Sequence, residues 1–171
     1  MSKKIAAVVT DLYEDVELTS PQKALTDAGH EVVIVGEEKG KEITGKQGGK
    51  ATVEVGIDEA NAADYDAVLL PGGFSPDLLR GDEQGRFGKF VKHFVENEKP
   101  SFAICHGPQL LIDTDLLKGK TVTSFLSVRK DLENAGAKVV DESVVVDKGI
   151  VTSRTPDDLE DFNRESLALL Q

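Results

Sequence analysis

Short runs of consecutive apolar residues, rich in β-branched side chains, recur along the chain. They lie at residues 5–9, 32–35, 67–70 and 101–104. A strand that is covered on both faces of a parallel sheet has this pattern, because neither face meets water. Segments 18–28 and 87–95 are predicted helices between these strands, the first ended by Gly29. This alternation predicts an α/β sandwich of three layers, with a mostly parallel sheet and helices on both faces.

The last third of the chain is predicted to extend the sheet and to end in a helix. Residues 122–125, 144–146 and 150–152 are short β-like runs expected to add edge strands, and Asp147-Lys148-Gly149 suits a tight hairpin between the last two. A helix over 159–170 follows Thr155-Pro156-Asp157-Asp158, which combines a cap, a first-turn proline and acids. The acids there are interpreted as helix electrostatics rather than as a cation site.

Length and charge narrow the class of protein. The 171 residues are expected to form one domain, residues 1–171, and they contain no stretch of 18 apolar residues. A net charge of -11 argues against nonspecific binding to nucleic acid or to an anionic membrane. A single cysteine excludes an internal disulfide. We therefore expect a cytoplasmic protein with neither nucleic-acid nor membrane partners.

The most informative segment is Ser101-Phe102-Ala103-Ile104-Cys105-His106-Gly107-Pro108. A buried strand runs there into a predicted helix, and the only thiol lies at the corner, at the carboxyl end of the strand where reactive groups collect in open α/β sheets. A helix N-terminus favours an anion and lowers the pKa of a cysteine. Cys105 is thus predicted to be a solvent-accessible thiolate near neutral pH, acting as a nucleophile or redox centre. The alternative is a small buried core residue.

Three strand ends should meet at one edge of the parallel sheet, namely Tyr13-Glu14-Asp15-Val16-Glu17, Pro71-Gly72-Gly73 and Cys105-His106. The glycine pair suits an oxyanion site, since its N–H groups can approach a substrate closely, although a plain tight turn explains it equally well. Glu14 or Glu17 can point toward the thiol, with a raised pKa that makes it a proton donor. Ordinary acids at a helix N-terminus are the alternative.

The remaining candidate chemistry is sparse. His106 titrates near neutrality and can move protons, although its side chain diverges from that of its neighbour Cys105. His30 and His93 lack metal-ligand spacing, so no metal site is predicted. The glycine-rich segment 40–49 resembles a phosphate-binding loop but has Gln47 where that motif needs a hydroxyl, and it is interpreted as a flexible loop.

Taken together, these motifs resemble the DJ-1/PfpI superfamily, in its bacterial stress-protein and intracellular-protease branch, over nearly the whole chain. Three further segments carry the resemblance: Leu70-Pro71-Gly72-Gly73, Val128-Arg129-Lys130-Asp131-Leu132-Glu133-Asn134-Ala135-Gly136-Ala137 and Ser153-Arg154-Thr155-Pro156-Asp157-Asp158-Leu159. The resemblance implies a flavodoxin-like sandwich that assembles as a homodimer or hexamer. No histidine follows His106, which argues against the glutamine amidotransferases of the same superfamily.

The resemblance also implies roles for individual residues. Cys105 would lie at a nucleophile elbow, with Glu17 meeting its sulfur and Glu14 nearby. Gly73 and His106 would supply N–H groups to the oxyanion site, to which Gly72 and Gly107 also belong. Asp77 holds the position of an acid that orients the histidine of a neighbouring subunit in the protease branch, where glutamate is common.

Two functions remain open from the sequence. The first is a cysteine-dependent stress enzyme, without a cofactor, that acts on a small electrophile such as a dicarbonyl or on damaged protein; glyoxalase, deglycase and peptidase chemistry all begin with attack by the thiol. The second is a redox sensor or holdase chaperone, in which Cys105 is oxidised and held by Glu17 without turnover.

Overall fold

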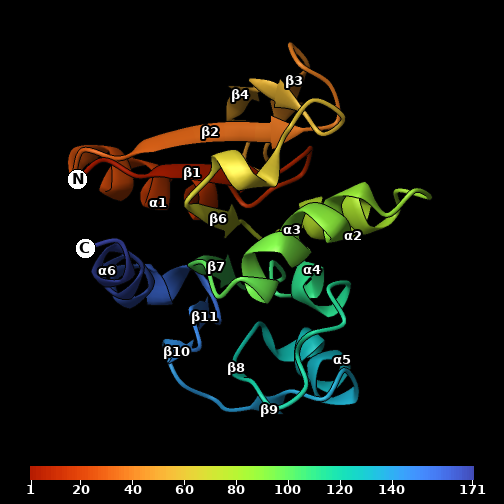
Figure 1. The fold of residues 1–171 in the computed structure, drawn as a ribbon, viewed down its shortest axis with the longest axis vertical. Coiled ribbons are helices and arrows are strands. Elements are labelled where there is room, and N and C mark those ends of the chain that lie inside the picture. Colours follow the sequence, from red (N-terminus) through yellow and green to blue (C-terminus); the bar gives the residue numbers. More distant parts are fainter.

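A computed structural model describes residues 1–171 and contains a central sheet of seven strands (Figure 1). The strand order is β10-β11-β7-β6-β1-β2-β5, and all neighbours are parallel except β10 and β11. The strands are β1 (Lys4–Val8), β2 (Glu31–Gly36), β5 (Val55–Gly56), β6 (Ala67–Leu70), β7 (Ser101–Ile104), β10 (Val145–Asp147) and β11 (Ile150–Ser153). The mostly parallel sheet predicted from the apolar runs is confirmed.

Helices cover both faces of this sheet. The helices are α1 (Asp15–Asp27), α2 (Ser75–Arg80), α3 (Arg86–Glu96), α4 (Gln109–Ile112), α5 (Arg129–Asn134) and α6 (Leu159–Leu169). Alternate residues of β1 belong to two separate cores: Ile5 belongs to the core that contains side chains of α1 and α6, whereas Ala6 belongs to the core that contains side chains of α2, α3, α4 and α5. The fold is therefore the expected three-layer sandwich, and the continuous apolar runs follow from burial on both faces.

Two small sheets lie outside the main one. The strands β3 (Glu42–Thr44) and β4 (Lys50–Thr52) form an antiparallel hairpin, while β8 (Thr121–Val122) and β9 (Lys138–Val139) form a parallel pair. The prediction that residues 122–125 add an edge strand to the main sheet is therefore wrong. The backbone N–H of Phe125 instead donates to the carbonyl of Cys105 at 2.9 Å, which ties this segment to the end of β7.

The glycine-rich segment 40–49 is not the free loop that its composition indicated. Its turn is fastened to the start of α1, because the Asp15 carboxylate accepts hydrogen bonds from the N–H groups of Gln47 at 3.0 Å and Gly49 at 2.8 Å. The N–H of Lys46 also donates to the carbonyl of Tyr13 at 2.9 Å. The turn is therefore held at the same sheet edge as the predicted site.

Element boundaries agree with the sequence pattern to within a few residues. The 67–70 and 101–104 strands match, and Lys148 and Gly149 both have positive φ in the predicted hairpin between β10 and β11. Helix α1 begins at Asp15, three residues earlier than predicted, and α2 and α5 were not predicted. None of the helices has both the length and the apolar character that crossing a membrane requires.

Candidate active site

Cys105 lies at a sharp turn immediately after β7. Its φ is +63°, in the left-handed region that costs energy for any residue with a side chain. The turn is held on both sides, because the N–H of Cys105 donates to the Ser153 carbonyl at 3.0 Å and its carbonyl accepts from Phe125. At Gly107 a Cβ atom would overlap the Leu70 carbonyl oxygen. This strained strand-to-helix turn has the form of a nucleophile elbow.

Glu17 approaches the thiol from the first turn of α1. The residue is fully buried, and its Oε1 accepts a hydrogen bond from the N–H of Gly72 at 2.8 Å. Its other oxygen, Oε2, is buried without a hydrogen-bond partner, and the carboxyl is close enough to Cys105 for each group to change the pKa of the other. Burial raises the pKa of Glu17 to about 8, although the Gly72 N–H opposes the shift. At neutral pH Glu17 is therefore a proton donor.

The thiol itself is not the accessible thiolate that the sequence predicted. Cys105 is 8 % exposed, and burial raises its pKa to about 12, with the negative charge of an ionised Glu17 adding to the effect. The expected helix dipole is weak here because α4 has four residues and begins only at Gln109. The prediction of ionisation near neutrality is therefore wrong, and at pH 7 both Cys105 and Glu17 carry protons.

His106 lies beside the sulfur even though it is the next residue in the chain. Its Nδ1 is 3.3 Å from the Cys105 Sγ, and its Nε2 is 3.4 Å from the Ser127 hydroxyl. The ring stacks on Phe125, with centroids 4.7 Å apart. Burial lowers the pKa of His106, and the nearby positive charge of Lys46 lowers it further. A neutral imidazole that contacts a protonated thiol can accept its proton.

The glycines of the site differ in whether their N–H groups are already hydrogen-bonded within the chain. Gly72 donates its N–H to Glu17, and Gly107 donates its N–H to the Ile104 carbonyl at 2.8 Å, so neither is free to stabilise an oxyanion. The N–H groups of Gly73 and His106 have no backbone acceptor, and the His106 N–H is directed at the Cys105 sulfur, where it lowers the pKa of the thiol. These two groups are the available oxyanion donors.

Neither Glu14 nor Asp77 makes a hydrogen bond to Cys105 or His106, although the charge of Glu14 adds to the raised pKa of the thiol. The Glu14 Oε2 is 3.8 Å from the Nζ of Lys46 and has no hydrogen-bond partner. Asp77 lies on α2 and makes no hydrogen bond to His106 within the chain. A pocket of about 310 Å³ opens beside the imidazole, and its lining consists of Lys46, Gly73, Phe74, Asp77, His106 and Gln109. Sequence reasoning missed Lys46, because only the hairpin brings it here.

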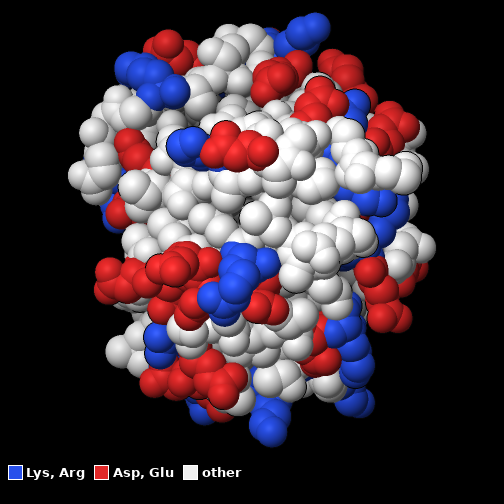
Figure 2. Space-filling model, turned by 90° about the vertical axis from the view of Figure 1, so that its left-hand side faces the viewer, with Lys and Arg blue, Asp and Glu red and all other residues white.

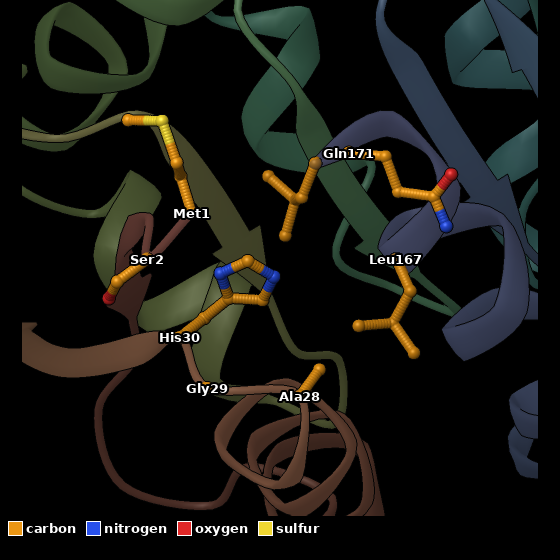
Figure 3. Close-up of a pocket in the computed structure, with 8 residues that line it drawn as sticks. Met1, Ser2, Ala28, Gly29, His30, Leu167 and Gln171 are labelled. Atoms are coloured by element: carbon orange, nitrogen blue, oxygen red, sulfur yellow. The ribbon is translucent and has the colours of Figure 1, made fainter.

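Another pocket, of about 460 Å³, lies at the opposite ends of the strands, near the starts of β1 and β2 (Figure 3). It is formed by the chain termini together with the ends of α1 and α6, where His30 and Leu167 point toward it. Figure 2 looks onto this end of the molecule, whose middle is largely uncharged, with acidic side chains gathered below. The pocket beside His106 is the candidate active site, because one of its lining residues, His106, contacts the Cys105 sulfur.

Comparison with known proteins gives the family of the chain. The family model described as the DJ-1/PfpI family matches residues 3–169. This chain belongs to the DJ-1/PfpI family. An uncharacterized protein of Staphylococcus saprophyticus is 62 % identical over 165 residues, which are 96 % of each chain. An uncharacterized protein of Staphylococcus aureus is 61 % identical over 171 residues, the full length of both chains.

Solved structures of DJ-1/PfpI proteins share the fold. A two-domain protein of Anabaena variabilis, with DJ-1/ThiJ/PfpI-like and ferritin-like domains, superposes with a TM-score of 0.94 at 40 % identity; the match covers 98 % of this chain and 50 % of that one. Schizosaccharomyces pombe DJ-1 gives a TM-score of 0.86 at 25 % identity, covering 98 % of this chain and 92 % of the other. The architecture is therefore the flavodoxin-like α/β fold of this family.

Proposed function

We propose that this protein is a cysteine-dependent stress-response enzyme that works in the cytoplasm on small carbonyl electrophiles, dicarbonyls above all, or on protein damaged by them. The observation that carries the proposal is the arrangement around Cys105. The carboxyl of Glu17, protonated at neutral pH, lies close enough to interact with the thiol, and a neutral imidazole lies 3.3 Å from the sulfur. A residue that served only to fill the core would need neither group.

Each neighbour has a distinct task in this mechanism. As the sulfur attacks a carbonyl carbon, the S–H proton passes to Nδ1 of His106, so that a free thiolate with its high pKa never accumulates. The developing oxyanion accepts hydrogen bonds from the N–H groups of Gly73 and His106. Glu17 holds a proton at neutral pH and can donate it near the reacting oxygen.

Methylglyoxal illustrates how the chemistry balances. Addition of the thiol to the aldehyde forms a C–S bond and a hydroxyl group. Transfer of the aldehyde hydrogen, as a proton, to the neighbouring ketone carbon gives a lactoyl thioester, and water then releases lactate and the thiol. No external oxidant or cofactor is consumed. Deglycase and peptidase reactions share the first attack.

Lactate formation from methylglyoxal tests the proposal. Cys105→Ala should abolish it while circular dichroism shows the wild-type fold, because the substitution leaves the backbone of the elbow in place. Cys105→Ser is the matched control, since it keeps the size of the side chain but removes the sulfur. Unchanged turnover in both variants would reject an enzymatic role for this thiol.

We further propose that the protein assembles as a homo-oligomer through an apolar patch beside the site. The patch consists of Leu12, Val16, Phe74 and Leu78, which are 43–49 % exposed. Its two halves are adjacent, since the N–H of Phe74 donates to the Leu12 carbonyl at 2.9 Å. Apolar groups gathered in this way favour a protein contact. Asp77 lies between Phe74 and Leu78 on the same helix, where a second subunit could use it to orient His106.

A redox sensor or holdase is the second candidate, and the unpaired Oε2 of Glu17 is the observation that favours it. A protonated carboxyl at that place can donate a hydrogen bond to an oxygen added to the sulfur. Intact mass after mild peroxide treatment separates the two functions. A stable gain of two oxygens on Cys105, together with negligible turnover of methylglyoxal, would favour the sensor.

A further inference from the structure

Lys46 is the only cation that lines the pocket beside His106. Its backbone is held in place by contacts that do not involve its side chain. The N–H of Lys46 donates to the Tyr13 carbonyl, and the two residues on either side of Gly48 donate to the Asp15 carboxylate. At Gly45 an added Cβ would overlap Oδ1 of Asp15. The turn is therefore packed tightly against α1, and the backbone of Lys46 is held in place while its side chain extends from the turn.

The ammonium of Lys46 is free to bind a ligand. Its side chain is 49 % exposed, and its one carboxylate neighbour, Glu14, is 3.8 Å away, beyond ordinary hydrogen-bond distance. Asp77, the other charged residue of this pocket, lies on α2 and repels an anion placed beside it. An anionic group in the pocket is therefore attracted to the Lys46 side, while the N–H groups of Gly73 and His106 receive the carbonyl oxygen.

We propose that Lys46 selects substrates with a carboxylate next to the reactive carbonyl, of the 2-oxo acid type, by binding that carboxylate while Cys105 adds to the carbonyl. The inference rests on the proposed function for the identity of the attacking thiol. In the addition the C–S bond forms and the carbonyl π bond breaks. The thiol proton passes through His106 to the new hydroxyl, so the step needs no further reactant. The positive charge of Lys46 also acts on His106 and Glu17, whose pKa values it lowers.

Alkylation of Cys105 by two reagents that differ in charge tests this without any turnover. Iodoacetate carries a carboxylate and iodoacetamide is neutral, and in both reactions the sulfur displaces iodide. The ratio of their rates, followed by intact mass at low salt, cancels differences in the reactivity of the thiol itself. Lys46→Gln should lower the iodoacetate to iodoacetamide ratio by about fivefold, in keeping with one charge at close range. Lys46→Arg should restore it.

A second lysine of the same hairpin provides the matched control. Lys50 lies on β4, is 57 % exposed and is 3.7 Å from Glu42, outside the pocket. Lys50→Gln removes the same net charge and should leave the ratio within about 1.5-fold of wild type, because solvent screens a distant charge. An equal fall in both variants would mean that only the overall charge matters, and the proposal would be overturned.

Protection of Cys105 by carbonyl compounds against alkylation tests whether Lys46 also determines which substrates bind. Glyoxylate, a 2-oxo acid, is also intrinsically more reactive toward thiols than acetaldehyde, so the informative quantity is the change in its advantage on substitution. The advantage of glyoxylate over acetaldehyde in slowing alkylation by iodoacetamide should fall severalfold from wild type to Lys46→Gln, and an unchanged advantage would refute the assignment of the substrate class. Failure of methylglyoxal turnover alone would instead count against the proposed function, since neither alkylation measurement depends on it.

Discussion

Replacing Glu17 by glutamine should stabilise the protein while removing its activity. The carboxyl has a pKa of about 8 in the folded chain and an ordinary value of 4.5. Between these pH values the folded state keeps a proton that the unfolded state has lost, so the free energy of unfolding falls as pH rises. The amide of the Glu17→Gln variant is uncharged at every pH, and its oxygen can still accept the Gly72 hydrogen bond. The variant should therefore escape this loss.

The size of the effect follows from the two pKa values. At about 1.4 kcal/mol for each pH unit, the interval from 4.5 to about 8 corresponds to about 5 kcal/mol of stability lost on passing through it. At pH 7 the glutamine variant should be more stable than wild type by about 3 kcal/mol, and near pH 4.5 the difference should vanish. Cys105 stays protonated in both states over this range, because its pKa is raised from an already high value.

Urea unfolding at pH 5, 6, 7 and 8, followed by circular dichroism, measures the difference. Glu37→Gln provides the control, since the Thr10 hydroxyl lowers the pKa of Glu37 and this carboxylate is therefore ionised in both the folded and the unfolded state from pH 5 to 8; the stability difference of this variant from wild type should stay nearly constant over that range. If Glu17→Gln changed the free energy of unfolding by the same amount at every pH, or destabilised the protein at pH 8, then the claim that Glu17 is buried and protonated in the folded chain would be refuted.

Three further predictions concern the elbow, the base and the oligomer. Gly107→Ala should destabilise the fold by about 3 kcal/mol or more in urea unfolding, because its Cβ would overlap the Leu70 carbonyl oxygen; wild-type stability would contradict the geometry. On the acid side turnover should fall only below pH 6.5, as the lowered pKa of His106 requires, and His106→Gln should remove this limb of the profile; on the alkaline side turnover should fall around pH 8, where Glu17 loses its proton. Leu78→Glu should reduce the mass found by analytical ultracentrifugation, whereas an unchanged oligomer would place the contact elsewhere.

The sheet was predictable because its strands are buried on both faces and their apolar runs are therefore uninterrupted. The short helices α2 and α5 have six residues each, too few to show a helical period. The segment 122–125 was misassigned because its residue types are β-like, whereas only its first residue pairs in a sheet and the N–H of Phe125 donates to the carbonyl of Cys105. The conformation of these three segments is set by tertiary contacts that the sequence pattern does not show.

The sequence was enough to predict which residues form the site, but not the protonation state of the thiol. Topology brought Cys105, Glu17 and His106 together because the ends of parallel strands share an edge. The thiol was expected to ionise because the sequence does not show that α4 is short or that Glu17 is buried against the sulfur. Lys46 carried no signal of its own, since its place depends on the fold of the β3–β4 hairpin.

Whether Cys105 is the nucleophile can be tested by stopping methylglyoxal turnover with acid and mapping the adduct by intact mass and peptide sequencing. We expect a methylglyoxal-derived mass on Cys105 that appears and decays in step with lactate formation, and we expect Glu17→Gln to slow its appearance. Lactate formation with modification only of lysine and arginine side chains, and none on Cys105, would contradict this role of Cys105.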